Sequence, residues 1–383
     1  MAPPQLRILS GLEQVPAAEW NRLVPGNHPF LRHEFLHAME RHGCVGAEFG
    51  WLPRHLTLWQ QGRLVAAMPL YEKHNGYGEF VFDHAWADAW ARAGLRYYPK
   101  LVSAIPYTPA TGRRLLAEPG REETLWPLLR QAAVELARAT GASGVHWLFP
   151  VAEEQRFLQR QGLLARHDCQ FHWRNRDYRD FDHFLTTLAA KKRKNIRRER
   201  RLVRQSGVRL RRFDGHDAGE AEWRAFADFY QRLFERKWGM ATFNHGFFHE
   251  VAQQLPEQVL LVLAERQGRY IAGALMYRSD DCLYGRHWGA IETVDGLHFE
   301  ACYYQGIEYC IERGLQRFEP GAQGEHKLAR GFLPVRTCSS HWVAAGGLRQ
   351  PVARFCADER AAVADYIERM ENASPYRRPD PAP

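Results

Sequence analysis

The chain has 383 residues, of which 45% are hydrophobic and 13% aromatic, and its formal net charge is +8. This length suits two domains of ordinary size better than one. The sequence predicts neither a membrane span nor a secretory signal, because it has no long apolar run and no basic N-terminal region followed by an apolar core. Seven scattered cysteines without CxxC or CxxH pairs favour reduced thiols in the cytoplasm and predict no bound metal.

The positive charge is concentrated in residues 191–204. Nine basic residues and one acid give this segment a net charge of +8, which equals that of the whole chain. Residues 181–203 have the apolar periodicity of one amphipathic helix, with Arg193, Arg197 and Arg200 on one arc. Guanidinium groups bind phosphate bidentately, so these three arginines are predicted to contact a phosphate-bearing partner. A solvated surface helix is the alternative.

The first half of the chain predicts the order helix, hairpin, strand, helix, strand. A hairpin is indicated by two alternating segments around Gln61-Gly62. The predicted helices are 30–42, 122–140 and 153–161, and the predicted strands are 55–60, 64–71, 78–82, 101–106, 144–149 and 168–174.

The second half repeats this order, and its hairpin again carries the tripeptide Gln-Gly-Arg, at 61–63 and at 267–269. We therefore expect an α+β chain with a weak internal duplication, divided into domains 1–178 and 179–373. The Pro-rich tail, 374–383, is predicted to be disordered. The predicted helices are 219–236, 298–313 and 352–370, and the predicted strands are 208–212, 259–266, 270–278, 282–288, 317–319 and 336–344.

Several long motifs resemble the bacterial family of predicted N-acyltransferases labelled peptidoglycan biosynthesis/recognition. The resemblance covers residues 27–370 and extends, more remotely, to the Fem-type aminoacyltransferases, which are tandem GNAT domains that use aminoacyl-tRNA. It implies tandem GNAT-like domains, each with a mixed, largely antiparallel sheet flanked by helices. The motifs are YGEFVFDHAWADAW (77–90), YTPATGRRLL (107–116), QFHWRN (170–175), KKRKNIRRERR (191–201), KWG (237–239), LYGRHWG (283–289), LHFEACYYQGIEYCI (297–311) and GAQGEHKLARGF (321–332).

One departure from the GNAT pattern concerns the donor. GNAT enzymes that bind acetyl-CoA usually carry a Gly-rich turn that opens a helix and holds the pyrophosphate on backbone amides. Residues 291–298 occupy the expected place in the second half and have one glycine, and 108–114 in the first half has no complete pattern. No tightly bound cofactor is expected, and both aminoacyl-tRNA and acyl-CoA stay open as acyl donors.

Residues 324–332, GEHKLARGF, form the densest polar motif outside the basic segment. Acyl transfer to an amine needs a base for the incoming nitrogen and donors for the developing oxyanion. Glu325 and His326 are candidates for the base, while Lys327 and Arg330 can stabilise charge or bind a phosphate. The resemblance to Fem-type enzymes, which place a lysine of a similar late motif at the catalytic channel, favours Lys327. A capped surface loop is the alternative.

A second candidate group lies in the first half of the chain. Asp83 and His84 combine two titratable side chains beside Trp86. Histidine has an unperturbed pKa near neutrality, which suits a general base. We therefore predict substrate contact for Asp83 and His84, with a structural histidine among tryptophans as the alternative.

A third candidate group lies where the strand 282–288 meets the helix 298–313. Arg286 and Trp288 end the strand, and Tyr303 lies in the first turns of the helix. By resemblance to GNAT sheets, this junction faces the donor, so all three are predicted to bind substrate. Core packing of the aromatic rings is the alternative.

The function predicted from the sequence is transfer of an acyl or aminoacyl group to an amine of a phosphate-bearing acceptor. A nucleotide-linked peptidoglycan precursor is the expected acceptor class, and tRNA is a further expected partner. Two alternatives stay open: acyl-CoA-dependent acylation of a small molecule or protein, and a non-catalytic protein that binds nucleic acid or a precursor. The sequence leaves the oligomeric state open.

Overall fold

The computed structural model describes residues 3–236, 239–322, 324–344 and 346–377. Two residues of the motif at 237–239, and Gln323 of the motif at 321–332, lie outside the described part. The chain forms two compact units: unit 1 is Met1–Asp168 with Arg336–Asp365, and unit 2 is Cys169–Val335 with Tyr366–Pro383. The predicted domains are continuous in sequence, whereas these units are not, because β9 (Leu164–Arg174), β15 (Leu333–Val343) and α12 (Gly346–Asn372) each contribute to both.

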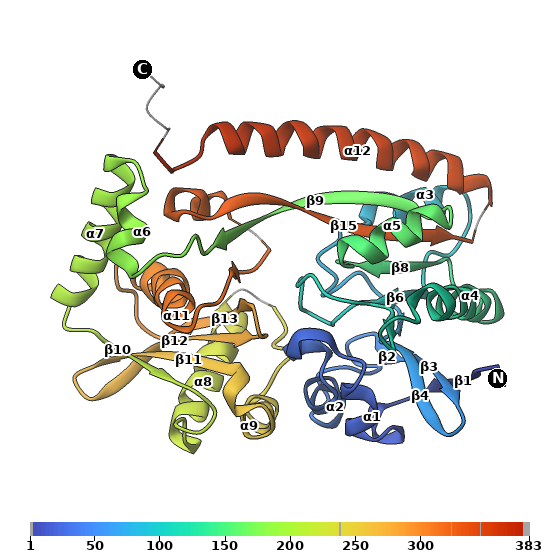
Figure 1. The fold of residues 1–383 in the computed structure, drawn as a ribbon, viewed down its shortest axis with the longest axis horizontal. Helices are drawn as coiled ribbons and strands as arrows, with labels where there is room; N and C mark the ends of the chain where they lie inside the picture. Colours follow the sequence, from blue (N-terminus) through green and yellow to red (C-terminus); the bar gives the residue numbers. More distant parts are fainter. Residues whose placement is uncertain (1–2, 237–238, 323, 345, 378–383) are drawn as a thin grey trace. The chain divides into compact units, whose positions relative to one another are not determined.

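Unit 1 contains a four-stranded sheet in the order β1-β3-β4-β7 and a second run of strands in the order β2-β5-β6-β8-β15 (Figure 1). In the second run, β6 is antiparallel to β5 and parallel to β8. The elements are β1 (Gln5–Leu9), α1 (Ala17–Asn21), α2 (His33–Arg41), β2 (Trp51–Pro53), β3 (His55–Gln60), β4 (Arg63–Met68), β5 (Tyr71–Lys73), α3 (His84–Arg92), β6 (Lys100–Ser103), β7 (Leu116–Ala117), α4 (Glu122–Thr140), β8 (Gly144–Leu148) and α5 (Ala152–Arg160).

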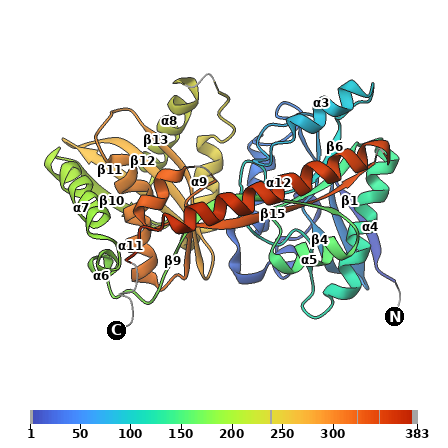
Figure 2. The ribbon, with the colours of Figure 1, turned by 90° about the horizontal axis from the view of Figure 1, so that it is seen from above.

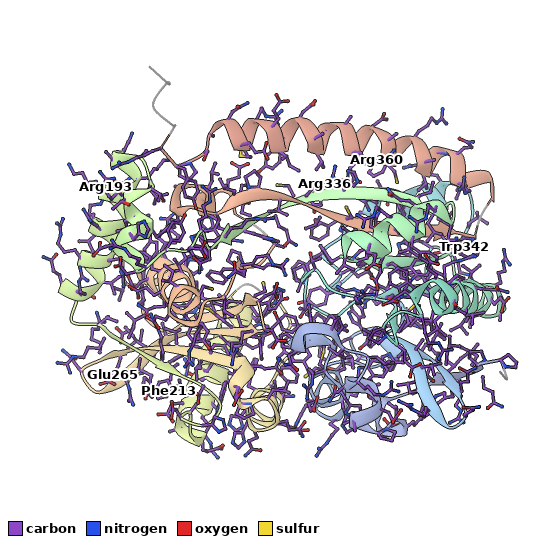
Figure 3. The ribbon with its side chains drawn as sticks, viewed as in Figure 1. Arg193, Phe213, Glu265, Arg336, Trp342 and Arg360 are labelled. Carbon is purple, nitrogen blue, oxygen red and sulfur yellow. The ribbon has the colours of Figure 1, made fainter. Side chains whose placement is uncertain are left out.

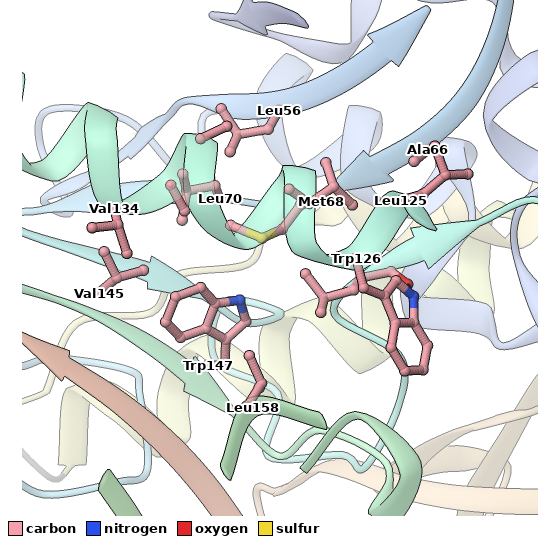
Figure 4. Close-up of a cluster of buried hydrophobic side chains, with 14 of the residues drawn as sticks. Leu56, Ala66, Met68, Leu70, Leu125, Trp126, Val134, Val145, Trp147 and Leu158 are labelled. Atoms are coloured by element: carbon pink, nitrogen blue, oxygen red, sulfur yellow. The ribbon is translucent and has the colours of Figure 1, made fainter. Parts of the chain in front are cut away.

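The core of unit 1 lies between α4 and the strands. Apolar residues of α4 recur at helical spacing, so Leu125, Leu129 and Ala133 share one buried face. This face packs with Val145 and Trp147 of β8, which are fully buried (Figure 4). The helix ends where Gly141 adopts φ 68°, a left-handed conformation that glycine accepts without strain.

Unit 2 contains strands in the order β10-β11-β12-β13-β14-β9. Helix α8 packs on β12 and β13, and the helical run from α10 to α11 packs on the other face, because Gly273 of β12 contacts α8 whereas Met276 contacts Gly306 of α11. The elements are α6 (Phe181–Thr186), α7 (Ala190–Gln205), β10 (Arg209–Phe213), α8 (Glu220–Arg236), α9 (His245–Gln254), β11 (Val259–Arg266), β12 (Arg269–Arg278), β13 (Cys282–Ala290), α10 (Leu297–Phe299), the π-helical turn η5 (Glu300–Tyr304), α11 (Gln305–Arg313), β14 (Arg317–Glu319) and the 3-10 helix η6 (Glu325–Arg330).

The predicted duplication is confirmed at the hairpins. Strands β3 and β4 form an antiparallel pair, as do β11 and β12. Gln61 and Gly62 have φ of 51° and 79°, and Gln267 and Gly268 have φ of 53° and 74°. Two positive values in succession define the type I′ turn that matches the twist of a hairpin. In unit 2, β13 is antiparallel to β12 and parallel to β14. In unit 1, β6 likewise is antiparallel to β5 and parallel to β8.

The prediction of one helix over residues 181–203 is wrong. Helix α6 ends at Thr186 and α7 begins at Ala190 (Figure 2), and Arg197 of α7 pairs with Asp182 of α6. The linking residues pair with the C-terminal segment: Arg377 N–H donates to the carbonyl of Thr187, and Ala189 N–H donates to the carbonyl of Pro375, both over 2.9 Å. Residues 374–377 of the predicted tail are therefore hydrogen-bonded, and 378–383 lie outside the described part.

The elements β1, α1, β2, α3, β7 and α9 were not predicted, and the predicted strand at 78–82 is wrong, because these residues form turns and bends. Helix α3 covers the run HAWADAWAR, in which Trp86 and Trp90 are four residues apart and are both buried. This spacing places both rings on one helical face, so the sequence contained the signal for a helix. Within the described residues, no helix combines the length and the apolar character needed to cross a lipid bilayer.

Candidate active site

A cavity of about 120 Å³ in unit 2 lies where two parallel strands diverge. Strands β13 and β14 pair only from Cys282–Arg317 to Tyr284–Glu319, after which β14 ends and β13 continues beside β12. A β-bulge lies at this point, because Met276 of β12 faces Gly285 while Leu275 faces His287, so Arg286 is the extra residue of β13. The cavity is lined by Ala274, Leu275, Met276, Gly285, Arg286, His287, Trp288, His298, Cys302, Tyr303 and Pro320.

All three residues of the predicted strand–helix junction line this cavity. Arg286, Trp288 and Tyr303 are brought together by the divergence of β13 and by the helical run that follows it. Burial lowers the pKa of Arg286 to about 10, although the carboxylate of Glu319 acts to raise it. The guanidinium group therefore stays positively charged at neutral pH.

Glu319 is a buried acid that the sequence reasoning missed. It ends β14, it is 2% exposed, and it lies 4.0 Å from the Nδ1 atom of His172 and 3.9 Å from a guanidinium nitrogen of Arg317. An acid at the end of a strand, directly before Pro320 and Gly321, was the available signal. The negative charge of Glu319 acts to raise the pKa of Arg286, against the effect of burial.

The π-helical turn η5 sets the directions of three polar side chains. Its wider turn places Glu300 toward α7, where it accepts from Arg200, and Tyr304 toward Glu199, to which it donates. Tyr303 instead forms a hydrogen bond of 2.9 Å with Nε2 of His326. Burial raises the pKa of Tyr303, so its hydroxyl keeps its proton. Single π turns are frequent at functional sites.

Lys327 of η6 is the most buried of the three predicted catalytic residues, with 2% exposure. Its Nζ atom donates to the carbonyl of Gly321 over 2.6 Å. Burial, and then the charge of Arg286, lower the pKa of Lys327 to about 7, while Cys302 acts in the opposite direction. Since Arg286 and Cys302 both line the cavity, Lys327 lies within electrostatic reach of it.

The other two predicted catalytic residues are exposed. Burial, and then the charges of Lys327 and Arg330, lower the pKa of His326, so the imidazole is neutral at pH 7. Glu325 accepts a hydrogen bond of 2.8 Å from the hydroxyl of Tyr366. The structure thus places a neutral imidazole, and not Glu325, on the hydroxyl of Tyr303 at the cavity wall.

Arg330 connects this motif to α7. Its guanidinium group donates to Glu199 and to the carbonyl of His326, both over 2.8 Å, and it lies 3.4 Å from the centroid of the Phe299 ring. Glu199 also accepts from Tyr304. Arg330 therefore contacts Glu199, His326 and Phe299, and it holds η6 against α7.

Of the three arginines predicted to contact phosphate, Arg200 is the most engaged. It donates to both oxygens of Glu300 over 3.0 Å and to Glu308 over 2.6 Å. Arg193, labelled on α7 in Figure 3, donates to the carbonyl of Leu188. Arg197 forms an exposed ion pair of 3.3 Å with Asp182, in which the side chains are 56% and 81% exposed.

A second cavity, of about 610 Å³, lies between α6, α7 and α11. The acidic side chains on its wall already have partners in the chain. Asp182 pairs with Arg197, Glu308 with Arg200 and Glu312 with Arg212. Asp180 accepts a hydrogen bond from the backbone of α6. Three arginines on its wall are exposed and make no ion pair within the described part of the chain. They are Arg179, Arg201 and Arg204. This cavity thus has an excess of positive charge.

Asp83 and His84 belong to unit 1, whereas the other predicted site residues belong to unit 2. Asp83 is 4% exposed and accepts from Lys100 and from the hydroxyl of Tyr97. Lys100 also donates to Glu79 over 2.8 Å, and burial raises the pKa of Glu79 to about 7. His84 is exposed and stacks on the ring of Phe82. Asp83 is therefore part of a buried ionic cluster.

We expect Asp83→Asn to lower the free energy of unfolding by about 1–3 kcal/mol, because it weakens buried hydrogen bonds to a charged donor. His84→Ala removes an exposed side chain and should change it by less than about 0.5 kcal/mol. Urea denaturation of both variants measures these values. Equal stability of Asp83→Asn and the unmodified protein would show that the cluster does not stabilise unit 1.

Solved structures resemble this chain over most of its length. The crystal structure of FemX matches with a TM-score of 0.53 and 11% identity, and covers 91% of this chain and 100% of that chain. The C-terminal domain of a putative lysylphosphatidylglycerol synthetase from Agrobacterium fabrum matches with a TM-score of 0.52 and 11% identity, and covers 91% and 97%. A tandem GNAT protein from the clavulanic acid biosynthesis pathway matches with a TM-score of 0.45 and 11% identity, and covers 89% of this chain and 99% of that chain.

These likenesses concern the fold, and they confirm the predicted α+β architecture of tandem GNAT type. The repeated arrangement of hairpin and parallel strand pair, with a cavity at the divergence of β13 and β14, defines a GNAT acyltransferase fold. The chain belongs to the FemAB-like family, described as peptidoglycan biosynthesis/recognition, whose profile matches residues 11–378. A comparison with curated proteins finds no match.

Proposed function

We propose that this chain is an N-acyltransferase that moves an acyl or aminoacyl group onto an amine of a phosphate-bearing acceptor, at the cavity in unit 2. The observation that carries this proposal is the cavity at the divergence of β13 and β14, with Arg286 and Tyr303 on its wall and the buried Lys327 beside it. In a GNAT sheet this divergence faces the donor, and the family is one of acyltransferases.

The reaction needs no covalent intermediate on the protein. The amine nitrogen attacks the acyl carbon, the bond from that carbon to the donor's sulfur or oxygen breaks, and one proton passes from the nitrogen to a base while the leaving group gains one. Holding both substrates in contact supplies much of the rate enhancement. Cys302 lines the cavity, but burial raises the pKa of its thiol, so it is not a thiolate nucleophile at neutral pH.

Three residues of the site have roles that follow from their protonation. His326 is neutral at pH 7 and is assigned as the base, with Tyr303 holding the ring in place. Lys327, with a pKa of about 7, is assigned to the oxyanion, which its protonated amine stabilises in a site of low dielectric constant. Glu325 is assigned to accept the proton from His326 and release it to solvent, because Glu325 is exposed and adjacent to His326 in the chain.

The acceptor's phosphate is assigned to the cavity between α6, α7 and α11. Arg197, Arg201 and Arg204 line it, and the last two make no ion pair with a described residue. The family description supports a peptidoglycan precursor as acceptor, and it also leaves room for a protein that only binds such a precursor. Arg193 stays a proposed contact at the N-terminal end of α7.

The test is a thermal-shift series with acetyl-CoA, an aminoacyl-tRNA and a nucleotide-linked muropeptide, followed by a transfer assay with each donor that binds. Stabilisation by a donor together with product formation supports the proposal. A shift with the muropeptide but with neither donor would identify a binding protein without transferase activity. A shift with no compound would contradict both functions.

A further inference from the structure

We infer that the acyl group accepted by the cavity at β13 and β14 is small and carries no ammonium group. This inference rests on the proposed function, because it assigns the acyl end of the donor to that cavity. It narrows the donor from acyl or aminoacyl groups to short acyl groups that are neutral or acidic. Its physical basis is the volume of the cavity and the charge of its walls.

The volume limits the acyl group to about ten heavy atoms or fewer. The cavity measures about 120 Å³, and one bound water molecule needs about 10–15 Å³ of a volume measured in this way. Its floor does not yield easily, because Met276 and Ala274 belong to the buried core. Gly285 leaves no space for expansion either, since a Cβ atom there would lie 3.2 Å from Cα of Pro320.

The charge of the walls opposes a cationic acyl group. Among the described residues that line the cavity, none carries a carboxylate, and one, Arg286, carries a positive charge. Lys327 adds a second basic group within electrostatic reach of the cavity. The charge of Glu319 acts on Arg286, and a carboxylate oxygen of Glu319 lies 3.9 Å from a guanidinium nitrogen of Arg317, so two guanidinium groups already oppose its charge. An ammonium group would thus enter a site that offers positive charge and no carboxylate, which is unfavourable.

Aromatic rings do not compensate for the missing carboxylate. Trp288 and Tyr303 both line the cavity, and cation–π contacts can hold an ammonium group. His298 already packs against both rings, with centroid distances of 5.3 Å to Trp288 and 5.4 Å to Tyr303. An ammonium group on these rings would also be close to Arg286, which borders the same cavity. An uncharged acyl group meets neither difficulty.

The decisive experiment compares two acyl groups that differ in charge but not in size. Glycyl and glycolyl groups are isosteric, because the first has an ammonium group where the second has a hydroxyl. Each is attached to two carriers, as the pantetheine thioester and as the 3′-acylamino derivative of 3′-deoxyadenosine, with acetyl as reference. Affinities are measured by titration calorimetry at pH 6.5, at which the glycyl amine is protonated.

On whichever carrier binds, we expect acetyl and glycolyl to bind alike and glycyl to bind at least about tenfold more weakly. Raising the pH to 9 deprotonates the glycyl amine and should bring its affinity toward that of glycolyl. Glycyl binding as tight as glycolyl at pH 6.5 overturns the inference and leaves the proposed function standing. Absence of binding by all three acyl groups on both carriers contradicts the proposed donor site itself.

A pair of cysteine variants locates the binding. Cys302→Leu extends a larger side chain into the cavity and should remove the affinity for acetyl and glycolyl probes. Cys338→Leu changes a partly buried cysteine of unit 1 in the same way, and should leave the affinity unchanged. Circular dichroism shows that each variant is folded. Unchanged affinity in folded Cys302→Leu would show that the acyl group binds elsewhere and would overturn the inference.

Discussion

Lys327→Met is expected to reduce kcat/KM for acyl transfer about 100- to 1,000-fold, the loss typical of removing one oxyanion donor. Methionine has a similar volume and keeps the packing of a residue that is 2% exposed, so the effect is expected on the reaction and not on the fold. Steady-state kinetics with the donor identified by thermal shift measures it. Activity within about threefold of the unmodified protein would remove Lys327 from the proposed mechanism.

The same variant has a signature in stability against pH. Burial lowers the pKa of Lys327 to about 7, below that of an exposed lysine, so the unfolded chain binds one more proton between these two values. The loss of stability caused by the buried charge of Lys327 is full below pH 7 and decreases as the pH rises. The stability of the unmodified protein should therefore rise relative to Lys327→Met by about 1.4 kcal/mol per pH unit above pH 7. Urea titrations at several pH values measure this slope, and Lys191→Met, at an exposed position, is the control.

Arg200→Met is expected to lower the free energy of unfolding by about 3 kcal/mol, because it leaves Glu300 without its arginine partner and removes one of the two arginines that pair with Glu308. Glu300 has a side-chain exposure of 5%, and Arg200 donates to it and to Glu308. Glu300→Gln in the same chain should recover part of the loss, since it removes the uncompensated charge. Denaturation of the single and double variants measures both effects.

The matched control is the double variant Arg201→Gln/Arg204→Gln. Both arginines are exposed on the same helix and make no ion pair with a described residue, so stability should change by less than about 0.5 kcal/mol per site. Binding of a nucleotide-linked precursor should instead weaken, and its salt dependence should decrease. If Arg200→Met left stability unchanged while abolishing binding, Arg200 would be a ligand contact and not a structural residue.

Much of the fold could be predicted because its signals are local. The two hairpins follow from alternating apolar residues around Gln-Gly turns, and α4 spans Glu122–Thr140 as its periodicity predicted. The break between α6 and α7 could not be predicted in this way. It depends on two hydrogen bonds, in which Arg377 N–H donates to the carbonyl of Thr187 and Ala189 N–H donates to the carbonyl of Pro375, between segments nearly two hundred residues apart in the chain.

The candidate site also contains residues that the sequence predicts and residues that only the tertiary structure identifies. Arg286, Trp288 and Tyr303 were found because a strand–helix junction is visible in the sequence, and the structure gathers them around one cavity. The engagement of Arg200 by Glu300 and Glu308 was not visible, because the acids lie a hundred residues further along. Glu319 was missed for a related reason, since a single acid at a strand end has meaning only beside Arg286.

The sequence by itself determined the tandem α+β architecture, the family and the concentration of positive charge on one helix, because periodicity, turn chemistry and motif identity are properties of short segments. Only the tertiary structure decided which of those charges are neutralised, which are exposed, and where a strand divergence leaves a cavity. Burial and ion pairing depend on residues that are distant in sequence and adjacent in space. The lowered pKa of Lys327 beside Arg286 is an effect of this kind.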